Sequence, residues 1–155
     1  LTPPANLQLI IGWTGSPAST SHLVDKVAIA KSREKETYER FLADSKKCLN
    51  TLIDGFKQGS LEAIQNGIQR NREILNHLAN FSKVQIETPT LKKMCDIAVQ
   101  HAAAAKSSGA GGGDCGIVVI DKARDISEMI DRWQENGITR LSLRVHPVID
   151  LDKEI

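Results

Sequence analysis

Apolar side chains recur at steps of three and four residues between positions 38 and 56, and this periodicity constrains the fold more than any other feature of the chain. The spacing places these side chains on one face of a long α-helix. An apolar face of that length has to be buried against other elements of the same molecule. The repeating positions are Tyr38, Phe41, Leu42, Leu49, Leu52, Ile53 and Phe56, and the polar Ser45 continues the same spacing.

A second long helix is predicted directly after the first. Gly55 and Gly59 end the first helix, and Ser60 starts the second as its cap. Two long helices joined by a short turn form a helical hairpin. The second helix carries its apolar side chains at Leu61, Ile64, Ile68, Leu75 and Leu78.

Three further helices are indicated by caps and by apolar spacing. One follows a cap at Ser19, Thr20 or Ser21. Another begins with Thr88 as its cap and Pro89 at its first position. The last contains residues 126–133 and is ended by an Asn-Gly pair at 136–137.

The periodicity changes in the remaining segments, which predict strands. Residues 7–13 and 115–120 are nearly continuous apolar runs, as in buried strands. A short extended piece is expected within residues 103–108, and alternation over residues 141–145 predicts a half-exposed strand. Helices on one face of a small, largely antiparallel sheet would bury all these apolar stripes. The sequence therefore predicts an α+β fold, a two-layer sandwich.

Composition narrows the functional classes. The chain of 155 residues is long enough for one domain with a genuine core. Twenty basic residues balance nineteen acidic ones, giving a net charge of +1. With this balance the chain has no excess of positive charge that would bind nucleic acid or an anionic membrane surface, so neither is expected as a partner.

The cysteines and the apolar runs suggest a cytoplasmic protein. Cys48, Cys95 and Cys115 are odd in number and far apart, and no Cys-x-x-Cys pair exists. This pattern predicts neither a disulfide framework nor a metal site. No apolar run reaches the length of roughly 18–20 residues that spans a bilayer.

The most informative segment is a glycine-rich loop at residues 106–114, Lys-Ser-Ser-Gly-Ala-Gly-Gly-Gly-Asp. Four glycines in five positions let the backbone adopt conformations closed to other residues. Successive amides can then point inward as an anion-binding nest, beside the charge of Lys106 and the hydroxyls of Ser107 and Ser108. Composition alone leaves a second interpretation open, in which the loop is a flexible connection without a ligand.

Two well-known phosphate loops are excluded. A Walker A loop ends in Gly-Lys-Ser/Thr and opens a helix, whereas here Asp114 follows the glycines and a strand comes next. A dinucleotide-binding fingerprint runs from strand to helix, but this loop runs from helix to strand.

The amino-acid sequence of the loop resembles a motif of a known family. Residues 105–116, Ala-Lys-Ser-Ser-Gly-Ala-Gly-Gly-Gly-Asp-Cys-Gly, are similar to the third conserved motif of the galactokinase, homoserine kinase, mevalonate kinase and phosphomevalonate kinase superfamily, and specifically to bacterial phosphomevalonate kinases. In that superfamily the loop lies near the terminal phosphates of the nucleotide and the acceptor. The resemblance implies this role for Lys106, Ser107, Ser108, Gly109, Ala110, Gly111, Gly112, Gly113 and Asp114.

A second segment, residues 12–22, resembles the strand-to-helix turn that lines the acceptor pocket of the same kinases. A helix start presents unpaired amides and a partial positive charge, which suits a phosphate or carboxylate. For any single hydroxyl here, capping the helix is the simpler interpretation. The resemblance implies substrate contacts from Ser16, Ala18, Ser19, Thr20 and His22.

The resemblance also implies an enzymatic activity, and it implies that this chain is one of the two domains of the enzyme. The expected reaction is phosphoryl transfer from ATP, with Mg²⁺, to mevalonate 5-phosphate, giving mevalonate 5-diphosphate for isoprenoid precursor synthesis. Residues 1–155 would form the ferredoxin-like C-terminal domain. The N-terminal ATP-binding domain, which carries the catalytic acid or base, has no counterpart in this sequence. The isolated fragment is therefore expected to be inactive.

Two other functions are left open by the sequence. One is the C-terminal half of a sister kinase acting on mevalonate or homoserine. The other is a binding module that senses a phosphorylated metabolite without catalysis, because the glycine loop suits it equally well. A helical interaction domain is less favoured, since the helix stripes are needed to cover the sheet.

Overall fold

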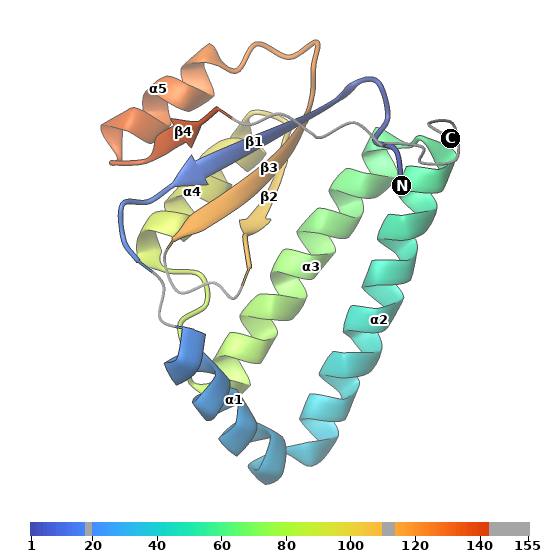
Figure 1. Cartoon of the computed structure of the whole chain (residues 1–155), viewed down its shortest axis with the longest axis vertical. Helices are drawn as coiled ribbons and strands as arrows, with labels where there is room; N and C mark the ends of the chain where they lie inside the picture. The colour runs from blue at the N-terminus through green and yellow to red at the C-terminus, as the bar shows by residue number, and fades with distance from the viewer. Residues whose placement is uncertain (18–19, 110–113, 143–155) are drawn as a thin grey trace, which may run out of the picture.

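The computed structural model describes residues 1–17, 20–109 and 114–142, apart from the side chains of residues 20 and 21. One four-stranded sheet is combined with five helices in this part of the chain (Figure 1). The elements, in chain order, are β1 Leu7–Trp13, α1 Thr20–Arg33, α2 Lys35–Gln58, α3 Leu61–Ser82, α4 Pro89–Gln100, β2 Ala104–Ser107, β3 Cys115–Asp121, α5 Ser127–Glu135 and β4 Thr139–Leu141.

The sheet has the strand order β2-β3-β1-β4, and every neighbouring pair is antiparallel. This is the split βαβ arrangement of ferredoxin-like folds, in which β3 lies between β1 and β2. The first crossover, from β1 to β2, contains four helices, and the second contains α5 alone. The predicted α+β class with a small antiparallel sheet is confirmed.

One face of the sheet is covered by α4 and α5 and holds the main core. Ile10, Val118 and Ile120 project from this face and pack against Met94 and Trp133, which are fully buried. The indole Nε1 of Trp133 donates to the carbonyl of Met94 at 3.2 Å, so the polar atom of this large side chain has a partner inside the core.

A second, smaller core lies on the opposite face, over β2 and β3. Ala104 and Val119 pack there against Ile64 and Ile68 of α3. They immediately neighbour Ala105 and Val118 in sequence, which belong to the main core, and successive side chains of a strand point to opposite faces. The structure therefore differs from the expected single helical layer, because α3 covers part of the second face.

The helical hairpin forms as predicted, with its turn at Gly59 and Ser60, but Gly55, which was also predicted to end the first helix, lies within α2. Gly59 adopts φ 65° at the end of α2, and the hydroxyl of Ser60 accepts from the amide of Ala63 at the start of α3. The two helices approach closely at Gly67, where a Cβ would lie 2.5 Å from the Cδ2 atom of Leu52. The cap of α4 is also confirmed, since the Thr88 hydroxyl accepts from the amide of Leu91.

Three details differ from the sequence expectations. Leu42 and Leu49 of α2 are 48% and 56% exposed, because α2 packs mainly on α3 and its stripe is only partly covered. Trp13, the last residue of the predicted buried strand 7–13, is 42% exposed. The last strand begins earlier than predicted, at Thr139, and the expected alternation beyond residue 142 lies outside the described residues. No helix in the described segments is both long and apolar enough to span a membrane.

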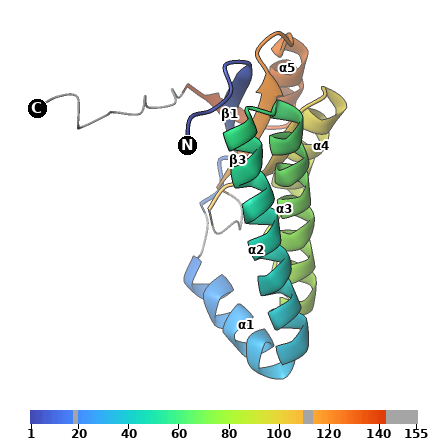
Figure 2. The ribbon, with the colours of Figure 1, turned by 90° about the vertical axis from the view of Figure 1, so that its right-hand side faces the viewer.

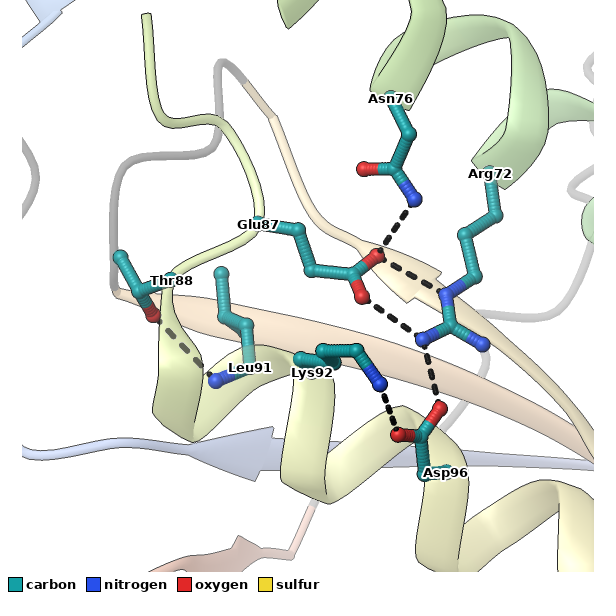
Figure 3. Close-up of polar contacts among 7 residues, drawn as sticks. All are labelled: Arg72, Asn76, Glu87, Thr88, Leu91, Lys92 and Asp96. Carbon is teal, nitrogen blue, oxygen red and sulfur yellow. Dashed lines mark hydrogen bonds and ion pairs between the residues drawn. The ribbon is translucent and has the colours of Figure 1, made fainter. Parts of the chain in front are cut away.

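A buried ion pair joins α3 to the start of α4 (Figure 3). The guanidinium of Arg72 donates to both carboxylate oxygens of Glu87, at 2.8 and 2.7 Å, and to Asp96 at 2.9 Å. The side chains of Arg72 and Glu87 are only 10% and 7% exposed. Asn76 and Lys92 complete the network by donating to Glu87 and Asp96. The hydrogen bonds that Arg72 donates to Glu87 are the largest cause of the raised pKa of Arg72.

Breaking this pair from one side is expected to destabilise the domain strongly. Glu87→Gln removes the buried charge partner of Arg72 and leaves only the more exposed carboxylate of Asp96, so the free energy of unfolding in urea should fall by about 3 kcal/mol. Asp96→Asn, at a carboxylate that is 41% exposed, is the matched control and should cost about 1 kcal/mol or less. Equal losses in the two variants would contradict the special role of the buried pair.

Candidate phosphate-binding site at the end of the sheet

The register of the sheet brings the two segments singled out in the sequence to the same place. Trp13, the last residue of β1, pairs with Cys115, the first residue of β3. The glycine-rich loop directly precedes Cys115, and the turn toward α1 directly follows Trp13. Segments about 100 positions apart in the sequence therefore meet at one end of the sheet.

Thr14 joins the two segments through hydrogen bonds. Its backbone amide and its hydroxyl both donate to the carbonyl oxygen of Asp114, each at 2.9 Å. The same hydroxyl accepts from the amide of Ser16 at 3.5 Å. Because Thr14 is only 9% exposed, these bonds are largely shielded from water. One side chain thus links the end of the glycine loop to the start of the acceptor turn.

The loop itself is a connection between antiparallel neighbours β2 and β3. At its base the amide of Ser108 donates to the carbonyl of Cys115 at 2.9 Å, and Gly109 adopts φ 63°, a conformation that favours glycine. Asp114, at the far end, is exposed. Residues Ala110, Gly111, Gly112 and Gly113 lie outside the described residues, so their predicted role in phosphate binding stays a prediction.

Lys106 and Ser107 lie on opposite faces of β2. Ser107 is 3% exposed on the face of the main core, a position that favours packing over ligand contact. Lys106 is half-buried on the other face, where burial lowers the pKa of its ammonium group. Among the described residues its ammonium group has no hydrogen bond or ion pair. A partly desolvated cation without a carboxylate partner is well suited to bind an anion.

The acceptor turn is described only in part. Ser16 and His22 are exposed, and α1 starts at Thr20 without an acidic residue in its first turn. Ala18 and Ser19 lie outside the described residues, as does the side chain of Thr20. α1, whose start carries a partial positive charge, therefore follows closely in the chain after Thr14, which is hydrogen-bonded to Asp114.

Two glycines let α4 lie close beneath this end of the sheet. A Cβ at Gly12 would lie 2.6 Å from the sulfur of Met94, and a Cβ at Gly116 would overlap the same side chain. Neither glycine was assigned a role from the sequence, and neither was Thr14. In retrospect, a threonine in a turn segment can be expected to accept a hydrogen bond from the amide two residues on, as Thr14 does from Ser16.

The fold and the meeting of these segments first define a class: an α+β domain of split βαβ topology in which the residue after β1, Thr14, is hydrogen-bonded to Asp114 at the end of the glycine-rich β2–β3 connection. The family follows from comparison. The family described as "GHMP kinases C terminal" matches residues 52–139, more than half of the chain. The chain belongs to this family of kinase C-terminal domains.

Similar proteins agree with the family. A phosphomevalonate kinase of Streptomyces sp. (strain CL190) is 37% identical over 145 residues, which are 92% of this chain and 39% of the relative. The Lin0012 protein of Listeria innocua is 35% identical, with a TM-score of 0.85 over 92% of this chain and 40% of that one. The Streptococcus pneumoniae phosphomevalonate kinase in complex with phosphomevalonate and AMPPNP is 31% identical, with a TM-score of 0.76 over 90% and 40%. The chain thus spans about two fifths of these proteins.

Removing the Thr14 hydroxyl should loosen the junction without abolishing the fold. In Thr14→Val the backbone bond to Asp114 is kept, but the side-chain bonds are lost, so the free energy of unfolding should fall by about 0.5–1.5 kcal/mol. Hydrogen exchange at the amide of Ser16 should become faster. Thr14→Ser keeps the hydroxyl and should retain most of the protection; equal exchange rates in both variants would contradict the role of this side chain.

Proposed function

We propose that this chain is the C-terminal domain of a phosphomevalonate kinase, an enzyme that transfers the γ-phosphate of ATP to mevalonate 5-phosphate and yields mevalonate 5-diphosphate. The observation that carries the proposal is the meeting of the glycine-rich loop and the acceptor turn at Thr14 and Asp114. A transfer between two phosphates needs donor and acceptor groups held side by side, and this junction offers one site for both.

The similarity to named relatives supports the choice of substrate. The Streptomyces relative is a phosphomevalonate kinase, and the Streptococcus enzyme was crystallised with phosphomevalonate and an ATP analogue. Both are more than 30% identical to this chain over at least 90% of its length. The substrate and the partner domain are carried from them to this chain as part of the proposal.

In the proposed mechanism the chain contributes positioning and charge. Amides between Ser108 and Asp114 bind phosphate oxygens, and the ammonium of Lys106 offsets negative charge that accumulates during transfer. The start of α1, with Ser16, Ser19 and Thr20 around it, orients the phosphate of the acceptor. Because phosphoryl transfer depends mainly on such electrostatic positioning, fixed backbone amides are effective catalytic groups.

ATP supplies the phosphoryl group, and Mg²⁺ accompanies its phosphates. The ammonium of Lys106, which is half-buried and has no carboxylate partner among the described residues, fits a polyphosphate. Within residues 1–17, 20–109 and 114–142 there is no group of three or more His, Cys, Asp or Glu side chains arranged to hold a metal. The resemblance implies that the catalytic acid or base belongs to the N-terminal domain of the proposed enzyme. A cytoplasmic location is part of the same proposal, consistent with the three free cysteines.

The proposal is tested with the full-length kinase that carries this chain. Purified enzyme with ATP and Mg²⁺ is assayed against mevalonate 5-phosphate, mevalonate and homoserine, with formation of ADP as the readout. We expect kcat/KM for mevalonate 5-phosphate to exceed the other two by at least about 100-fold, because a site built for a phosphate leaves polar groups unpaired when that phosphate is missing. Preference for mevalonate or homoserine would reassign the chain to a sister kinase, and binding without turnover would indicate a sensor.

Replacing Lys106 is expected to separate activity from stability. In the full-length kinase, Lys106→Met should lower kcat/KM by about 100-fold, because it removes a cation from the transferred phosphate. The same change should raise the melting temperature at neutral pH, because it removes a partly desolvated charge. Lys122→Met, at an exposed lysine after β3, is the matched control and should alter neither quantity.

The stabilising effect of Lys106→Met should depend on pH. Burial lowers the pKa of Lys106 below the ordinary 10.5, so the charged form destabilises the folded state at neutral pH. This penalty fades as the pH rises through the lowered pKa toward 10.5, where the folded protein loses the proton first. The difference in unfolding free energy between wild type and variant should therefore shrink at alkaline pH. A constant difference would contradict the desolvated state of Lys106.

A further inference from the structure

A surface cavity of about 210 Å³, which we call the junction cavity, lies where α1 packs against the end of α3. Figure 1 and Figure 2 show this junction at the open end of the helical hairpin, opposite its turn. The cavity is lined by Lys26, Ile29 and Arg33 of α1, by Ser82, the last residue of α3, and by Lys83 directly after it. Three of these five side chains are cationic and none is acidic.

The positive charge of the junction cavity is only partly offset by its surroundings. The guanidinium of Arg33 lies 3.6 Å from the carboxylate of Glu34 and donates to the carbonyl of Phe81 at 3.3 Å. The ammonium groups of Lys26 and Lys83 form no ion pair or hydrogen bond with any residue that the structure describes. Cations gathered in one place repel one another, and a bound anion offsets this repulsion.

The end of α3 does not account for both lysines. A helix C-terminus attracts cations because its last carbonyls carry partial negative charge. Here the carbonyls of Ala79 and Asn80 accept from the backbone amides directly after the helix. The carbonyl of Phe81 accepts from Arg33. The ammonium groups of the two lysines are therefore available to a ligand.

A buried hydroxyl without a partner is a second, independent indication of a ligand. Ser82 is 4% exposed, and its Oγ atom has no hydrogen-bond partner in the described segments. A buried hydroxyl that stays unpaired costs free energy. Because Ser82 lines the junction cavity, rotation about χ1 to another staggered rotamer can turn its hydroxyl toward a ligand there.

We propose that the junction cavity binds a phosphate group, either free phosphate or the phosphate of a small organic ester. A phosphate ester carries a charge of roughly −1.5 to −2 at neutral pH and three acceptor oxygens, which suit three cations and one hydroxyl donor. Ile29, which is 61% exposed, offers an apolar contact for an organic part.

This site is separate from the candidate site at the end of the sheet. α1 begins at Thr20, and Lys26 lies about 9 Å further along the helix axis. A phosphate in the junction cavity joins the middle of α1 to the end of α3, whereas the candidate site uses the turn before α1. The inference therefore does not depend on the proposed reaction.

Hydrogen exchange with mass spectrometry tests the proposal at the site itself. The full-length kinase in phosphate-free buffer is compared with samples that contain inorganic phosphate, glycerol phosphate or, at equal ionic strength, sodium chloride. Both phosphate compounds should slow exchange several-fold in peptides covering residues 80–86, because a ligand that joins the two helices suppresses local opening at the end of α3. Chloride should not.

The outcomes of this comparison are distinct. An effect at lower concentrations of glycerol phosphate than of inorganic phosphate identifies an organic phosphate as the ligand class, and the reverse order identifies free phosphate. No slowing by either compound, or equal slowing by chloride, would overturn the proposal.

Charge variants show whether the lysines of the cavity are responsible. Lys26→Met combined with Lys83→Met should abolish the slowing by phosphate, because it removes the two unpaired cations. Lys46→Met combined with Lys122→Met removes the same charge at two exposed lysines outside the cavity and should keep the slowing. An equal response to phosphate in the two double variants would show that the effect arises elsewhere, and the proposal would be wrong.

Removing the buried hydroxyl should have opposite effects on stability and on binding. In phosphate-free buffer, Ser82→Ala should keep or raise the melting temperature of the full-length kinase, because it deletes a hydroxyl without a partner. The phosphate concentration that gives half-maximal slowing should rise by about 3- to 10-fold. A lower melting temperature together with an unchanged response to phosphate would show that this hydroxyl has an internal partner, and its role as a ligand donor would be lost.

These readouts report on the end of α3 and not on turnover. If the kinase prefers mevalonate or homoserine while phosphate slows exchange in residues 80–86, the substrate assignment fails and the phosphate site stands. If mevalonate 5-phosphate is the preferred acceptor while exchange is unaffected, the phosphate site fails and the substrate assignment stands.

Discussion

The antiparallel pairing of β1 with β3 is the interaction on which the rest of the structure depends. Seven residue pairs, from Leu7 with Asp121 to Trp13 with Cys115, fix the register. Because side chains alternate along a strand, a slip of one residue would turn the core-facing side chains outward. The same register sets where the pairing stops, and at that point Thr14 binds the carbonyl of Asp114. Core packing and the geometry of the candidate site therefore have one common cause.

The helices support this end of the sheet from two directions. Met94 of α4 packs beneath Gly12 and Gly116, where no side chain larger than hydrogen fits without rearrangement. The ion pair of Arg72 with Glu87 holds the start of α4 against α3. The proposed phosphate site needs amides that keep their orientation as charge develops, and α4 supports the strands from which the loop extends.

Much of the fold was predictable from local patterns. The apolar run of residues 7–13 and the cap of α4 at Thr88 were located correctly, because strand periodicity and capping are properties of neighbouring residues. The partial exposure of Leu42 and Leu49 was not predictable, since it depends on how α2 sits over α3. The exposure of Trp13 was not predictable either. An apolar residue in a strand indicates burial, but it does not say which other element of the fold packs against it.

The site was only partly accessible to sequence reasoning. Resemblance singled out the glycine loop and the acceptor turn as two separate motifs, but their junction required the strand order. Thr14 could not be singled out from the sequence, because its partner Asp114 is 100 positions away. The accepting group is a backbone carbonyl, which every residue has. The burial of Lys106 likewise follows from the packing of α3 over β2 and not from its neighbours in the chain.

The most direct test of the account is a crystal structure of the full-length kinase with mevalonate 5-phosphate and a non-hydrolysable ATP analogue. The central claim is that one end of the sheet presents a single phosphate site built from both segments. The account predicts phosphate oxygens within hydrogen-bonding distance of loop amides between Ser108 and Asp114 and of groups in the turn that follows Thr14. Phosphates bound elsewhere, with those amides turned away from the ligand, would contradict it.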